Sequence, residues 1–172
     1  MLEHSPEGAV GVVLNRPSET KLGEIASELG PWAAPPGLVH VGGPVAPAAA
    51  VCLGRSRRTA RRPASPEPKA ETSTESEGVS PLFGRILSVD LDRGVDAFGK
   101  ALVELRLFAG YAGWAAGQLD GEVDVGGWFV VDRKDDDVFS RSPQDLWREV
   151  LRRQKRRNLA MLAAFPEDPD LN

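Results

Sequence analysis

The chain has 172 residues, with 21 basic and 25 acidic side chains, and its formal net charge is −4. Hydrophobic residues make up 41% and charged residues 27%, the mixture of an ordinary globular domain. This composition excludes a collagen-like protein, a disulfide-rich scaffold and a membrane-spanning protein. The length favours a single domain over residues 1–172.

Two blocks of regular structure are predicted on either side of an unusual segment. The first block opens with the valine-rich run 9–14, which is typical of a strand and is ended by the turn-forming residues 15–18. Apolar residues at helical spacing then predict a helix that stops at Gly30-Pro31. The expected elements are strands at 9–14, 38–41 and 49–53 and a helix at 22–29.

The segment 55–81 separates the two blocks. It is rich in proline, serine and threonine, it contains no aromatic residue, and Val79 is its only large apolar residue. Such a stretch buries too little surface to offset its ordering entropy. We therefore expect a disordered loop that interrupts the single domain.

The second block alternates strands and helices. Its clearest helix starts at Ser142-Pro143, where serine is a favoured cap and proline a favoured first residue. The expected strands are 84–89, 105–109, 127–131 and 159–165, and the expected helices are 94–103, 118–123 and 143–158. This irregular order of short elements predicts an α+β (α/β) fold, with a curled or barrel-like β-sheet flanked by helices.

Several separated strings together resemble the YqgE/AlgH family of bacterial proteins. They are Glu3-His4 with the stretch from Gly8 to Pro17, the turn 41–45, the run from Arg106 to Trp114 with 117–119 after it, and the residues 136–139, 146–147 and 166–172. The resemblance implies a compact α/β protein with a curled sheet. It implies no agreed catalytic residue, and the AlgH branch carries a suggestion of transcriptional regulation. It also implies a further strand before Met1, so we expect either a start upstream or a missing edge strand.

A glycine-aromatic segment is the main candidate for a ligand or partner site. Its two glycines permit close backbone approach, and its aromatic side chains offer flat faces with one polar end each. A second candidate lies where the first strand ends. The candidate residues are Gly110, Tyr111, Gly113, Trp114 and Gln118, and Asn15 and Arg16. The competing interpretations are a turn whose aromatics fill the core and an Arg16 that pairs with Glu3, Glu7 or Glu19.

No metal or cofactor site is predicted. The chain lacks the common dinucleotide, phosphate-loop, zinc-protease and paired-cysteine motifs. His40 lies in a predicted strand, where a satisfied structural histidine is expected, and His4 lies near an exposed end. The acidic run 135–137 is expected to be a solvated turn, and Cys52 a buried thiol without a disulfide partner.

These observations leave three functions open. The first is a non-enzymatic binding or regulatory protein with an unknown protein or small-molecule partner. The second is a DNA-binding regulator that uses the basic helix 143–158, although the acidic balance argues against nucleic acid. The third is an enzyme of unknown class with a site near Tyr111. Without a signal peptide or membrane segment, the expected location is cytoplasmic, with no membrane partner.

Overall fold

The computed structural model describes residues 1–57, 78–154 and 161–163. In this part of the chain, eight strands form one sheet in the order β1-β2-β8-β5-β7-β6, and the pair β3-β4 joins it through β8. The strands are β1 (Glu3–Ser5), β2 (Gly8–Gly11), β3 (Pro17–Lys21), β4 (Leu38–Val41), β5 (Val45–Ser56), β6 (Val79–Phe83), β7 (Ile86–Val89) and β8 (Leu102–Ala115).

Short helices surround this sheet. The α-helices are α1 (Leu22–Ile25), α2 (Val95–Phe98), α3 (Gln118–Asp124), α4 (Asp135–Val138) and α5 (Leu146–Arg152). Three 3-10 helices are η1 (Ser27–Trp32), η2 (Leu91–Arg93) and η3 (Pro143–Asp145). Within the described ranges, no helix is both long and apolar enough to cross a membrane.

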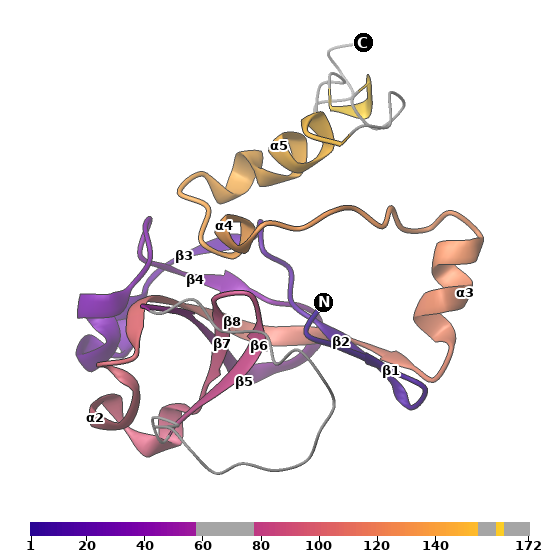
Figure 1. Ribbon diagram of the computed structural model, residues 1–172. Helices are drawn as coiled ribbons and strands as arrows, with labels where there is room; N and C mark the ends of the chain where they lie inside the picture. The colour runs from indigo at the N-terminus through magenta and orange to yellow at the C-terminus, as the bar shows by residue number, and fades with distance from the viewer. Residues whose placement is uncertain (58–77, 155–160, 164–172) are drawn as a thin grey trace.

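Strand β8 organises the sheet. One of its sides pairs antiparallel with β5. Its other side pairs in parallel with β4, where His40 lies opposite Phe108, and then antiparallel with β2, where Ala9 lies opposite Trp114. The sheet therefore curls into a half-barrel, as Figure 1 shows, and the predicted curled sheet with flanking helices is confirmed.

Both faces of the sheet are buried, and the alternation of side chains along β8 explains why. Leu105 and Leu107 belong to the larger core, which also contains residues of α1, η1 and α2. Phe108 belongs to a second core, which Val138 of α4 helps to cover. The intervening Arg106 is 1% exposed and donates to the Val138 carbonyl.

Glycines allow two pieces of backbone to cross at the middle of β8. A Cβ on Gly43 would overlap the backbone of Tyr111, and one on Gly42 would overlap the Gly110 carbonyl. Gly110 itself has a φ of 69°, in the region that favours glycine. Gly110 of the predicted site thus serves the packing of the 42–43 turn on β8, whereas a Cβ on Gly113 would meet only the side chains of Tyr111 and Val45.

Several predicted elements have different bounds in the structure. The strand at 38–41 is confirmed, and the helix at 118–123 is α3. The strand predicted at 9–14 ends at Gly11, and the helix predicted at 94–103 ends at Phe98 because Leu102 begins β8. The predicted strand 127–131 is unpaired, and Met161 and Leu162 are helical rather than part of a strand.

The predicted loop 55–81 is wrong at both of its ends. Arg55 pairs with β7 and β8, Ser56 pairs with β8, and Val79 to Pro81 pair with β7. Residues 58–77 lie outside the described residues. Cys52 is buried as predicted, and burial raises the pKa of its thiol to about 12, which keeps the thiol protonated and unreactive at neutral pH.

Candidate functional site

Two of the predicted site residues meet at the carboxyl end of β8, around a carboxylate that the sequence did not single out. Glu122 of α3 accepts hydrogen bonds from the indole N–H of Trp114 at 3.0 Å and from that of Trp128 at 2.6 Å. The Gln118 amide donates to the other carboxylate oxygen at 2.9 Å, and its carbonyl accepts from the Ala115 N–H. One acidic side chain thereby fixes two tryptophans and a glutamine.

The two indole rings form an edge-to-face pair with centroids 5.8 Å apart and an interplanar angle of 80°. The hydrogen bonds from Trp128, Gln118 and Trp114 stabilise the ionised carboxylate, so they lower the pKa of Glu122. Glu122 is therefore charged at neutral pH. The tryptophan pair is anchored by a charge-assisted contact rather than left to rotate freely.

Beyond this pair, the chain runs as an extended trace from α3 to α4 (Figure 1). The side chains of Trp128, Phe129 and Val130 are 50%, 53% and 72% exposed. Among the described residues, no backbone N–H or C=O of Trp128–Val131 has a hydrogen-bond partner. This connector is apolar, exposed and unpaired at the same time.

The chain before and within the connector is acidic, and the basic residues Arg133 and Lys134 follow it. Residues 118–132 contain four acidic and no basic side chains. His4 of β1 reaches the same side and lies 3.2 Å from Asp120. We call this region the acidic aromatic surface and define it by Trp114, Asp120, Glu122, Asp124, Trp128, Phe129, Val130 and Asp132.

The remaining predicted site residues lie elsewhere or serve packing. Gly110, Tyr111 and Gly113 are within strand β8, so neither a turn nor a loop is present there. Tyr111 is half-buried, and its ring lies beside Gly113. Trp114 is also half-buried and belongs to neither core, so the interpretation that it fills the core is wrong.

Asn15 and Arg16 lie in the loop between β2 and β3, away from the groups that contact Glu122. The Arg16 carbonyl accepts from the Val41 N–H, while its side chain is exposed. Among the described residues, its guanidinium makes no ion pair with Glu3, Glu7 or Glu19. The predicted pairing is therefore wrong.

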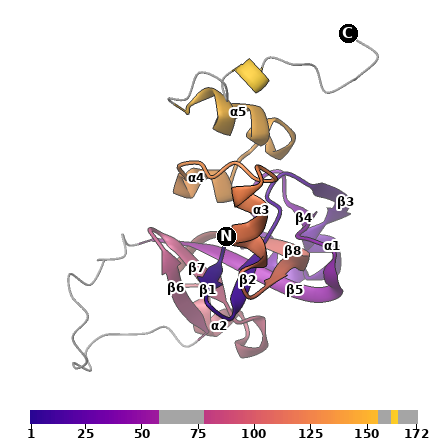
Figure 2. The same cartoon turned by 90° about the vertical axis from the view of Figure 1, so that its right-hand side faces the viewer.

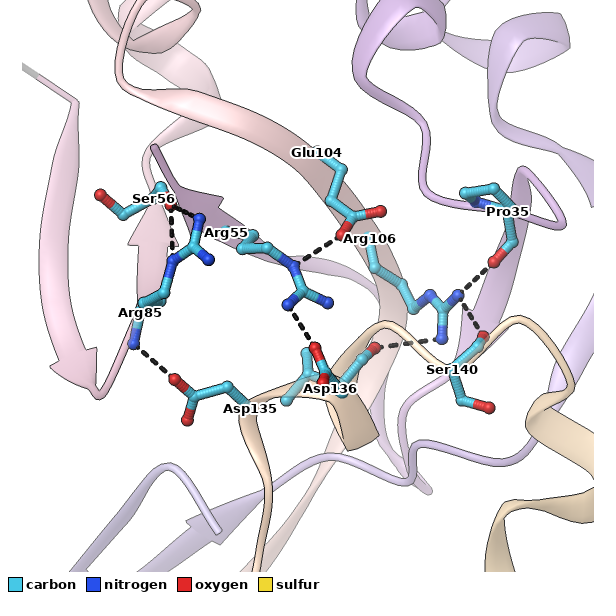
Figure 3. A network of polar contacts seen from close by, with 10 residues as sticks. Pro35, Arg55, Ser56, Arg85, Glu104, Arg106, Asp135, Asp136 and Ser140 are labelled. Atoms are coloured by element: carbon cyan, nitrogen blue, oxygen red, sulfur yellow. Dashed lines mark hydrogen bonds and ion pairs between the residues drawn. The ribbon is translucent and has the colours of Figure 1, made fainter. Parts of the chain in front are cut away.

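A second polar region lies where α4 meets the sheet. It is built by three arginines, Arg55, Arg85 and Arg106 (Figure 3). Arg85 holds the Ser56 carbonyl through its side chain, and its N–H donates to Asp135 at 2.8 Å. Arg55 lies between Glu104 at 2.6 Å and Asp136 at 2.5 Å. Its contact with Asp136 lowers the pKa of that carboxyl.

The acidic run is thus not a solvated turn. Asp135 to Asp137 form the first turn of α4, and Asp137 is buried. Asp137 makes a two-pronged ion pair with Arg153, which follows α5, and also accepts from the Lys134 N–H at 2.7 Å. Each of the three carboxylates is therefore engaged by an arginine or a backbone N–H, and together they brace α4.

A groove of about 520 Å³ runs between this braced helix and α5. Four basic and four acidic side chains line it, together with apolar Phe139 and Leu146. The pairs Arg55–Asp136 and Arg153–Asp137 neutralise half of those charges. Tyr111 does not line this groove, so the groove lends no support to an enzyme site near that residue.

The predicted basic helix 143–158 is described only up to residue 154. It comprises η3 and α5, which stand out from the sheet, as Figure 2 shows. Over 143–154 there are three arginines against Asp145 and Glu149. Arg153 is held by Asp137.

Comparison with known proteins identifies the family to which this chain belongs. The family model described as AlgH-like matches residues 1–158. The chain belongs to the AlgH-like family. A UPF0301 protein of Streptomyces avermitilis is 43% identical over the whole chain, which covers 83% of that relative. A UPF0301 protein of Thermobifida fusca is 41% identical over 96% of this chain and 80% of the relative.

Two solved structures share the fold. A crystal structure of a protein from Corynebacterium diphtheriae superposes with a TM-score of 0.78 at 28% identity, covering 95% of this chain and 79% of that one. The solution structure of AlgH from Pseudomonas aeruginosa gives 0.62 at 26% identity, covering 96% and 82%. These similarities confirm the predicted AlgH-type fold and name no activity.

Sequence reasoning missed Glu122 and Trp128. One signal was available for the first, because Glu122 lies four residues after Gln118 and so shares its face of a helix. The only signal for Trp128 was a run of strand-forming residues, Trp128-Phe129-Val130-Val131, which pointed to a strand rather than to an exposed surface.

Proposed function

We propose that this AlgH-like protein is a non-enzymatic cytoplasmic protein that binds another polypeptide on the acidic aromatic surface. The observation that carries the proposal is the exposure of Trp128, Phe129 and Val130 beside a tryptophan pair fixed by Glu122. Folded proteins seldom expose contiguous large apolar side chains without a use for them. Aromatic residues held in place are also the side chains that contribute most to protein interfaces.

The charges support a polypeptide rather than a nucleic acid. Four carboxylates and no basic side chain lie within 118–132, and phosphates would be repelled there. In the described part of the basic helix, two acids and the Asp137–Arg153 pair offset most of the positive charge. The DNA-binding alternative thus has less support than protein binding.

Photo-crosslinking in the native host tests this proposal. A photoreactive amino acid replaces Phe129 in the full chain, and adducts are identified by mass spectrometry after irradiation. We expect a discrete protein adduct, because the exposed Phe129 side chain would lie against the partner. The matched control places the same amino acid at Glu28, an exposed residue of η1.

Equal adducts at the two positions would indicate non-specific contact and would contradict the proposal. The absence of an adduct at Phe129, in cells that contain the full chain at its native level, would also contradict the proposal. A Trp128→Ser variant adds a further check, since loss of the aromatic pair should reduce the Phe129 adduct while the protein stays folded.

A further inference from the structure

We propose that the partner binds by adding a β-strand to the connector Trp128–Val131, and that the added strand is an extended basic peptide. This inference rests on the proposed function and names the chemistry of the partner. It combines three independent observations: the unpaired backbone, the anchored ends of the connector, and the charges around it.

The connector is a strand without a neighbour. Tryptophan, phenylalanine and valine are strand-forming residues, and the sequence alone predicts a strand at 127–131. In the structure the segment bends at Trp128 and then runs as an open trace, and among the described residues no hydrogen bond reaches the backbone of Trp128–Val131. A row of free N–H and C=O groups is the template that strand addition uses.

Both ends of the connector are held. At one end the Gly127 N–H donates to the Glu122 carbonyl at 2.8 Å, and the Trp128 indole donates to the Glu122 carboxylate. At the other end Arg153 donates to the Asp132 carbonyl at 2.9 Å, and the Val131 side chain packs near Leu151. A segment fixed at both ends loses little entropy when a partner strand joins it.

Charge selects the partner. Asp124 precedes the connector, and Asp120 and Glu122 lie on α3 beside that end. Asp132 follows the connector, where Arg153 already contacts its carbonyl, so the acidic charge is concentrated at the α3 end. Pairing of the connector with that of a second copy would bring these carboxylates together, and like charges across a strand pair are destabilising. A peptide that carries lysine or arginine meets the opposite charge instead.

Synthetic peptides of six residues, acetylated and amidated, are the probes for this proposal. The first alternates lysine and valine, the second alternates glutamate and valine, and the third is the first with alternate backbone nitrogens methylated. Binding to the full chain is followed by amide chemical shifts in NMR titrations. We expect saturable binding of the lysine peptide centred on Trp128–Val131, and binding at least about tenfold weaker for the other two.

Matched variants of the protein test the backbone directly. Val130→Pro removes one free N–H at a side chain that is 72% exposed, whereas Val130→Thr keeps the N–H. We expect the proline variant to bind the lysine peptide at least about tenfold more weakly and the threonine variant to bind like the native chain, both with unchanged melting temperature.

The outcomes separate this inference from the proposed function. Equal binding of the methylated peptide, or of the proline variant, overturns strand addition. Equal binding of the glutamate peptide overturns the basic partner, and so does a lysine peptide that fails to bind. If a Phe129 adduct still forms in cells, the proposed function survives such a result; if no adduct forms either, both fall.

Discussion

Replacing Arg106 by methionine is expected to lower the free energy of unfolding by about 3 kcal/mol or more. The Arg106 guanidinium is buried and donates to the carbonyls of Pro35 at 2.6 Å, Val138 at 3.0 Å and Ser140 at 2.9 Å. Methionine fills similar space but leaves three acceptors without donors. The bond to Val138 is buried and the other two are partly buried. A buried, unpaired carbonyl costs about 1–3 kcal/mol and a partly buried one less, and together these losses exceed what is regained by removing a buried charge.

Urea denaturation measures this loss, and Arg16→Met is the matched control. Arg16 is exposed and its side chain has no described partner, so its replacement should change stability by less than about 0.5 kcal/mol. An Arg106→Met variant as stable as the control would show that the three carbonyls find other donors. The arginine would then not hold α4 on the sheet.

His40 is expected to make the protein progressively less stable below pH 6.5. Burial is the main cause that lowers the pKa of His40 to about 4, and the charge of Arg106 adds to it. Between pH 6.5 and 4 the unfolded chain takes up a proton that the folded protein does not. The free energy of unfolding therefore decreases as the pH is lowered through this window, and His40 does not affect it above pH 6.5. The expected loss by pH 4 is about 3 kcal/mol from this residue.

Unfolding free energies measured at several pH values check this expectation, with His40→Gln as the test variant. Its pH profile should be flatter than that of the native chain between pH 4 and 6.5, by about 3 kcal/mol. The variant His4→Gln, which replaces an exposed histidine paired with Asp120, serves as the comparison for a histidine replacement at the surface. Parallel profiles for the native chain and His40→Gln would show that His40 is protonated in the folded protein.

The sequence was most informative where its pattern reflects local structure. The strand at 38–41 is bounded by turn residues, and helix 118–124 follows a glycine, so both were found. Arg106 shows the limit of such patterns. Its place between Leu105 and Leu107 suggests an exposed polar face, but α4, about 30 residues later, covers that face. Only the tertiary fold reveals that both faces are buried.

The strand predicted at 127–131 has no neighbouring strand in the described structure, and the physical reason is clear. Strand propensity describes how well residues fit a pleated, partly buried surface, and it does not reveal whether a neighbouring strand exists. Residues 127–131 have the propensity without the neighbour. The same limit applies to the candidate site: Trp114 and Gln118 were found from their residue types, whereas Glu122 and Trp128 join them through contacts that depend on the path of the chain after β8.

The central claim is that Trp128–Val131 is an unpaired strand in the free protein, open to a partner. Hydrogen exchange of its backbone amides, resolved by NMR on the full chain without any peptide, measures this directly. We predict exchange within about tenfold of an unstructured peptide at these four amides, against strong protection at Leu105 and Leu107 in β8. Protection at Trp128–Val131 comparable to that of β8 would contradict the account, because the segment would already have its partner.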